Sequence, residues 1–267
     1  KLRYMPREAQ GHGWMLSSVL RAIEAGSLTL PPPFRERPSL GSRTLVQTRF
    51  VAMMHGIIRD FEQWQEAPKL KAAQLLQALL VYVEEYVTEH LHVLVPALAR
   101  AIVSTDGEVR ECVDGCCRLI GQYVETAVLL HVISSAAGAG PELPQRKAFL
   151  KVLTSVLVGS KFSGSAGNHV GEILDLISDD TILKSEALDT CSVATELMQA
   201  LAEAAEEKFV EDDEAFEHAA LVLLQLGSQG SPSAKDAQSS GEAKAVLERL
   251  ASSRSKAPEE GLRQFGA

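Results

Sequence analysis

Apolar residues recur at helical spacing along most of this chain, and the helices that they predict come in pairs. The clearest case is residues 106–123, where apolar side chains recur at steps of one and three residues, so that they share one face of an α-helix. The preceding stretch, 89–103, shows the same spacing, and only a few residues separate the two. Helices joined by so short a turn lie antiparallel, so residues 89–123 are predicted to form a helical hairpin.

The hairpin pattern repeats along the chain. One hairpin cannot bury its apolar face alone, whereas stacked hairpins bury a continuous core. Successive pairs lie about 36 to 48 residues apart, the interval found in helical-hairpin repeat proteins. We therefore predict an all-α fold, an α-α superhelix built as a solenoid of antiparallel hairpins. The predicted pairs are 43–64 with 68–87, 89–103 with 106–123, 125–137 with 145–159, 168–178 with 182–206 and, more weakly, 213–226 with 241–253.

Four segments are expected along the chain. Residues 1–26 contain a short amphipathic helix around Trp14, which we expect to be part of a truncated repeat, because the chain starts at Lys1 without an initiator methionine. Residues 43–226 form the solenoid. Residues 227–241 have almost no apolar content and are predicted to be a disordered loop, and residues 242–267 a terminal helix with a frayed tail.

Composition limits the classes of function. The chain has 267 residues, a hydrophobic content of 46% and a net charge of −9, which argues against a nucleic-acid-binding role. No apolar run approaches the roughly 20 residues of a membrane span. The four cysteines make no disulfide framework, so a reducing compartment is expected. Cys112 and Cys116 share the apolar stripe of their helix and are expected in the core, with Cys117 as the more exposed thiol.

No constellation of catalytic or metal-binding residues emerges from the sequence, so we expect no enzyme activity, no cofactor, no metal and no small-molecule substrate. His90 and His92 are two residues apart, a spacing that does not bring helical side chains together. The glycine-rich stretch after Gly159 lacks the ending of a phosphate-binding loop and is expected to be an inter-helix loop. The paired carboxylates Glu84/Glu85 and Asp179/Asp180 are interpreted as helix-end charges.

Two features are candidates for contact with a protein partner. Residues 203–217 carry eight acidic side chains against one lysine, more than helix capping requires. We select five of the acids, Glu207, Glu211, Asp212, Asp213 and Glu214, as the candidate contact with a basic partner. Trp14 could also contact a partner, whereas Trp64 lies on the apolar stripe of its helix and is expected in the core.

Residues 88–123 resemble a HEAT repeat. Pro96 lies inside the first helix, Asp106 stands in the turn preceded by Thr105 as the expected N-cap, and Val109-Arg110 begin the second helix. In HEAT-repeat proteins the aspartate and the arginine form a ladder along the stack. The resemblance therefore implies that Arg110 pairs with Asp106, with Glu108 as another candidate partner for the arginine. The motif is weaker in the other repeats.

A closer resemblance covers residues 43–160. Leu79–Leu91, Leu94–Leu98, Arg118–Val124 and Val128–Leu130 are similar to the HEAT-repeat factors that preassemble axonemal dynein arms. The resemblance implies a non-enzymatic cytoplasmic scaffold whose partners are the dynein intermediate chain or other dynein arm subunits. Two other HEAT classes stay open, a tubulin-binding module of the TOG type and an importin-like adaptor. Acidic turns argue against the first of these, since tubulin is itself acidic.

Overall fold

The computed structural model describes residues 30–63, 65–138, 143–160, 165–179, 182, 188–228 and 240–254. Within these ranges the regular structure is helical and no strand is present. Residues 240–254 form the last described helix. The other helices are α2 (Leu40–Phe61), α3 (Glu66–Val83), η2 (Glu84–His90), α4 (Leu91–Ala101), α5 (Gly107–Tyr123), α6 (Thr126–Gly138), α7 (Leu143–Ser160), η3 (Ser165–His169), α8 (Val170–Ile177), α10 (Leu188–Ala204), α11 (Glu206–Glu211) and α12 (Asp213–Ser228), of which η2 and η3 are short 3-10 helices.

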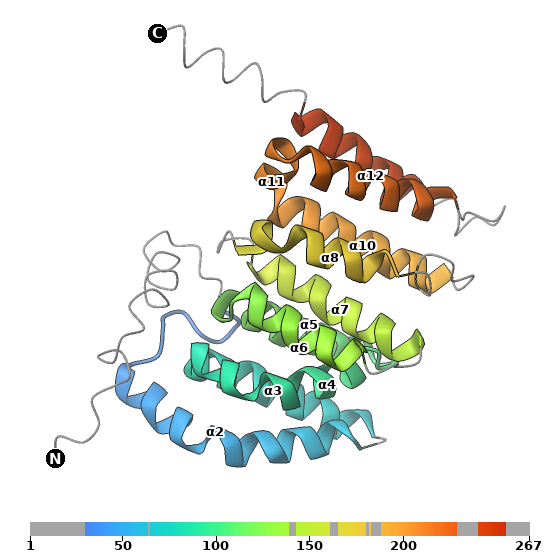
Figure 1. Ribbon diagram of the computed structural model, residues 1–267. Helices are drawn as coiled ribbons and strands as arrows, with labels where there is room; N and C mark the ends of the chain where they lie inside the picture. The colour runs from blue at the N-terminus through green and yellow to red at the C-terminus, as the bar shows by residue number, and fades with distance from the viewer. Residues whose placement is uncertain are drawn as a thin grey trace, which may run out of the picture.

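The helices stack in two layers along the molecule (Figure 1). One layer contains α3, α5, α7 and α10, each in contact with the next, and we call it the α3–α10 layer. The other contains α2, α4, α6, α8 and α12 in the same sequential order. Because the chain alternates between the layers, each hairpin adds one helix to both. The predicted all-α solenoid of helical hairpins is confirmed.

The middle of the α3–α10 layer is buried on two sides. α5 lies between α3 and α7, so side chains that point toward either neighbour lose contact with water. Cys116 and Cys117 are both fully buried, while Cys112 is half-buried. The expectation that Cys117 is the more exposed thiol is therefore wrong: a helix with neighbours on both sides has more than one buried stripe.

Two glycines allow α5 and α7 to approach closely. A Cβ atom on Gly121 of α5 would lie 2.9 Å from the carbonyl carbon of Val156 in α7, and even closer to its oxygen. A Cβ atom on Gly159 of α7 would lie 2.7 Å from the carbonyl carbon of Arg118 in α5. Carbon atoms in contact normally stay about 3.5–4.0 Å apart. The crossing of α5 and α7 thus depends on backbone-to-backbone contact at both glycines.

The end of α3 carries a buried ionic cluster. α3 ends at Val83, before the predicted boundary at residue 87, and Glu84 follows with a positive φ of 50°. Its carboxylate is fully buried and accepts hydrogen bonds from Arg37 Nε and Nη2, both at 2.7 Å, and from Arg43 Nη1 at 2.5 Å. Glu84 does lie at a helix end, but as a buried acceptor for two arginines. Arg37 precedes α2, so the cluster fixes the chain entering the first described hairpin.

Some expectations concern residues outside the described ranges. These expectations are the helix in 1–26, the core position of Trp64, most of the loop 227–241 and the whole tail after residue 254. The proposed division into four segments therefore stays a prediction. Among the described helices, none has the length and apolar content that crossing a membrane requires.

Candidate partner-binding surface

The HEAT-like turn between α4 and α5 is closed by Asp106. Its Oδ1 accepts hydrogen bonds from the backbone amides of Glu108 at 2.8 Å and Val109 at 3.3 Å, so Asp106 is the N-cap and α5 begins at Gly107. The expectation that Thr105 is the N-cap is wrong by one residue. Asp and Thr both favour this position, and the backbone geometry of the turn selects the aspartate.

Arg110 binds the same turn from the other side. Its Nη1 donates to the carbonyl oxygens of Ser104 at 2.8 Å and Thr105 at 3.0 Å. The Ser104 hydroxyl donates to Glu66 Oε2 at 2.7 Å, which ties the turn to the start of α3 in the preceding hairpin. This hydrogen bond, together with Lys69, lowers the pKa of Glu66.

The four residues of the HEAT-like motif, Pro96, Asp106, Val109 and Arg110, occupy different positions in the hairpin of α4 and α5. Pro96 lies inside α4, and Val109 is fully buried. Asp106 and Arg110 hydrogen-bond to the backbone of one turn. The ladder of Asp106 and Arg110 along the stack, which the resemblance implies, stays a prediction.

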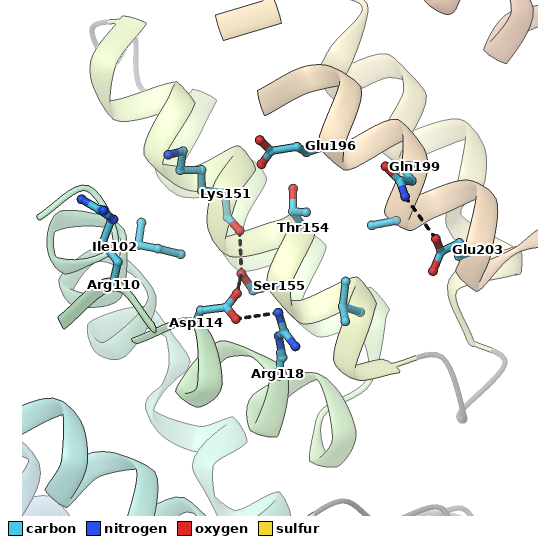
Figure 2. A pocket seen from close by; sticks show the side chains of 12 residues that line it. Ile102, Arg110, Asp114, Arg118, Lys151, Thr154, Ser155, Glu196, Gln199 and Glu203 are labelled. Atoms are coloured by element: carbon cyan, nitrogen blue, oxygen red, sulfur yellow. Dashed lines mark hydrogen bonds and ion pairs between the residues drawn. The ribbon is translucent and has the colours of Figure 1, made fainter. Parts of the chain in front are cut away.

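A groove crosses the α3–α10 layer over three consecutive helices (Figure 2). It has a volume of about 340 Å³. Each helix contributes residues three or four positions apart, which is the spacing that aligns side chains along one helix face. The lining consists of Ile102 beside Arg110, Asp114 and Arg118 of α5, Lys151, Thr154, Ser155 and Val158 of α7, and Glu196, Gln199, Ala200 and Glu203 of α10.

The α5 side of the groove is held by its own hydrogen bonds. Arg118 Nη2 lies 2.8 Å from Asp114 Oδ2, and the Ser155 hydroxyl donates to Asp114 Oδ1 at 2.5 Å (Figure 2). Asp114 is therefore bonded from both α5 and α7. The Thr154 hydroxyl donates to the carbonyl oxygen of Leu150 at 2.9 Å, as is usual for threonine in a helix. These polar groups stabilise the surface.

Sequence reasoning did not identify the groove. The polar residues of α5, α7 and α10 are visible in the sequence as the positions between the apolar stripes. What the sequence does not show is that the polar faces of these three helices meet, because that depends on how successive hairpins rotate along the stack.

The acidic segment 203–217 divides into bonded and exposed groups. Asp212 is the N-cap of α12, accepting from the amides of Glu214 at 3.0 Å and Ala215 at 3.2 Å, and Lys208 Nζ lies 2.9 Å from its Oδ2. These contacts, with that of Lys208 first, lower the pKa of Asp212. Asp213 is paired with Arg254.

The other three residues of the candidate acidic contact, Glu207, Glu211 and Glu214, are exposed. Asp212 and Asp213 are bonded to neighbouring side chains, so part of the acidic excess is structural. The contact of these five residues with a basic partner stays a proposal. The three glutamates and Asp213 are exposed, and Asp213 is the one of these four that pairs with a neighbouring arginine among the described residues.

Burial shapes the chemistry of the α5 thiols and of His90. Burial raises the pKa of Cys116 and Cys117 well above the ordinary value, which suppresses the reactive thiolate form. His90 contacts the rings of Phe50 and Tyr86, and burial lowers its pKa. Across the described ranges, no group of three or more His, Cys, Asp or Glu side chains is placed to hold a metal ion.

The family model and the similar proteins that match this chain carry the same family name. The model of the HEAT-repeat domain of dynein axonemal assembly factor 5 matches residues 29–223. The human protein named dynein axonemal assembly factor 5 is 30% identical over 128 residues, which are 48% of this chain and 14% of the human protein. Its mouse counterpart is 34% identical over 136 residues, 48% of this chain and 15% of that protein. No solved structure matches the chain.

The match extends further along the chain than the resemblance seen in residues 43–160, and it includes all three helices of the groove. The aligned part corresponds to about one seventh of the length of the human and mouse relatives, at 14% and 15%. Because the family model covers well over half of this chain, the chain belongs to the HEAT-repeat family of dynein axonemal assembly factor 5.

Proposed function

We propose that this chain is a non-enzymatic scaffold that acts in the cytoplasm during the preassembly of axonemal dynein arms. The observation that carries the proposal is the family match over residues 29–223, whose relatives are named as dynein axonemal assembly factors. A stack of helical hairpins suits this role, since it offers an extended surface to other proteins.

The chemistry of the groove supports binding rather than catalysis. Its hydroxyl groups are occupied: Ser155 donates to Asp114, and Thr154 donates to a backbone carbonyl. Asp114, the carboxylate nearest to a hydroxyl, is paired with Arg118 through one oxygen and accepts from Ser155 through the other, so both of its oxygens are engaged within the protein. The surface offers charges to a partner protein, while the groups that could attack a substrate are bonded within the protein.

The partners that we propose are subunits of the dynein arms, with the intermediate chain as the first candidate. The tagged chain, incubated with cytosol from ciliated cells, should recover axonemal dynein arm subunits, identified by mass spectrometry, well above an unrelated helical-repeat protein of similar charge. Recovery of tubulin alone would favour the TOG-type alternative, and recovery of nuclear import cargo would favour the importin-like one. Failure to enrich any dynein arm subunit would refute the proposal.

A further inference from the structure

The charges of the groove change sign from one end of it to the other. The part formed by α5 and α7 carries three cations, Arg110, Arg118 and Lys151, against one carboxylate, Asp114. The part formed by α10 carries two carboxylates, Glu196 and Glu203. A ligand of one charge would be attracted at one end and repelled at the other, so the groove suits a partner whose own charge changes sign along its length.

Two charges on neighbouring helices of the groove are available for a partner, Lys151 on α7 and Glu196 on α10 (Figure 2). Lys151 makes no ion pair with any other residue that the structure describes, although its stem is half-buried. Glu196 is exposed, and from the described residues it accepts one long hydrogen bond, that of the Ser192 hydroxyl at 3.4 Å. The other charges are more engaged: Arg118 pairs with Asp114, and Arg249 Nη1 lies 3.2 Å from Glu203 Oε1. Lys151 and Glu196 are therefore the residues that would gain most from new ion pairs.

The span of the groove sets the length of the ligand. Packed helices lie about 8–10 Å apart, and one such step separates α7, which carries Lys151, from α10, which carries Glu196. An extended chain advances about 3.3 Å per residue, so about three residues would cross from one charge to the other. The apolar side chains of Ile102, Val158 and Ala200 also line the groove. They could contact the uncharged middle of such a segment.

We propose that this groove binds an extended segment of a partner protein, with acidic side chains over α5 and α7 and, about three residues beyond the acidic side chain at Lys151, basic side chains over α10. The inference rests on the proposed function, because the partner is then a dynein arm subunit. It goes further by naming the surface, the chemistry of the segment and the distance between its two charged ends.

Charge reversal in the full chain tests the inference. Lys151→Glu and Glu196→Lys each turn an attraction into a repulsion, and each should lower the recovery of dynein arm subunits from ciliated-cell cytosol about tenfold, the effect of roughly 1.4 kcal/mol. Lys244→Glu and Glu248→Lys are matched controls, since they reverse one exposed i,i+4 pair on the helix 240–254, outside the groove. The controls should stay within twofold of the wild-type chain.

Circular dichroism of each variant checks that the helical stack is intact, and the neutral variants Lys151→Gln and Glu196→Gln should show smaller losses than the reversals. Wild-type recovery retained by both groove reversals would overturn this inference and leave the proposed function standing. Equal losses in the controls would overturn it too, because the attraction would then depend on overall charge. If the wild-type chain recovers no dynein arm subunit, the proposed function and the inference are both wrong.

Discussion

Replacing Gly121 by alanine tests the packing that supports the groove. The added methyl group would lie 2.9 Å from the carbonyl carbon of Val156 and closer still to its oxygen, so α5 and α7 would have to separate by roughly 1 Å. The obstacle is backbone, which cannot rotate away as a side chain could. Overpacking of this kind costs about 1–3 kcal/mol, and here we expect the upper end of that range.

Part of the cost is offset by the helix itself. Alanine is favoured over glycine in a helix interior by about 1 kcal/mol, which leaves a net loss of about 2 kcal/mol for Gly121→Ala. Gly56→Ala in α2 is the matched control, because a Cβ at Gly56 meets no atom within 4 Å. The control should gain about 0.5–1 kcal/mol. The same substitution is thus predicted to have opposite signs at two helical positions.

Thermal and urea denaturation followed by circular dichroism measure both effects. Gly121→Ala should lower the melting temperature by roughly 4–8 °C, whereas Gly56→Ala should raise it slightly. Gly159→Ala should resemble Gly121→Ala, and the double variant should lose less than the sum of the two, since both act at one crossing. If Gly121→Ala were as stable as Gly56→Ala, the close approach of α5 and α7 would be refuted.

Three further predictions concern single side chains. Asp106→Ala should cost about 1 kcal/mol of unfolding free energy through loss of the N-cap, and Thr105→Ala should change stability little; equal effects in urea denaturation would contradict the assignment of the cap. Glu84→Gln should destabilise by about 3–5 kcal/mol because it leaves Arg43 buried beside a neutral amide, and an unchanged urea midpoint would refute the importance of the buried ion pairs. Burial lowers the pKa of His90, so the contribution of His90 to stability is complete above the ordinary pKa of 6.5 and is lost as the pH falls below 6.5 toward the folded-state pKa. The fall in melting temperature from pH 7.5 to 5.5 should therefore be smaller in His90→Gln than in the wild-type chain. An identical fall in both would contradict this.

The sequence predicted the architecture because helical spacing is a local signal. The apolar stripe of α5, the short turn before it and the repetition of the hairpin could all be recognised without coordinates. The wrong expectation that Cys117 is the more exposed thiol assumed a single buried stripe on α5, whereas α5 has neighbouring helices on both sides. The number of buried faces depends on the layer in which a helix lies, which a single helix pattern does not contain.

The features that the sequence did not reveal depend on contacts between distant residues. Glu84 meets Arg37 and Arg43 across more than 40 positions, at separations of 47 and 41. Gly121 and Gly159 have their role because two helix backbones touch, and nothing in the adjacent sequence indicates which glycines do so. The groove is a third case, since its charge order arises only when α5, α7 and α10 are placed side by side.

Photocrosslinking from the groove tests most directly the claim that this surface of the stack is the one that binds the partner. A photoreactive benzoylphenylalanine would replace Val158, which lies half-buried in the lining of the groove, and in a control chain it would replace Ala245, which is exposed on the helix 240–254. In ciliated-cell cytosol, we expect the chain labelled at position 158 to crosslink to a dynein arm subunit within a segment that changes from acidic to basic, and the control chain not to do so. Crosslinking of dynein arm subunits from position 245 but not from position 158 would contradict it.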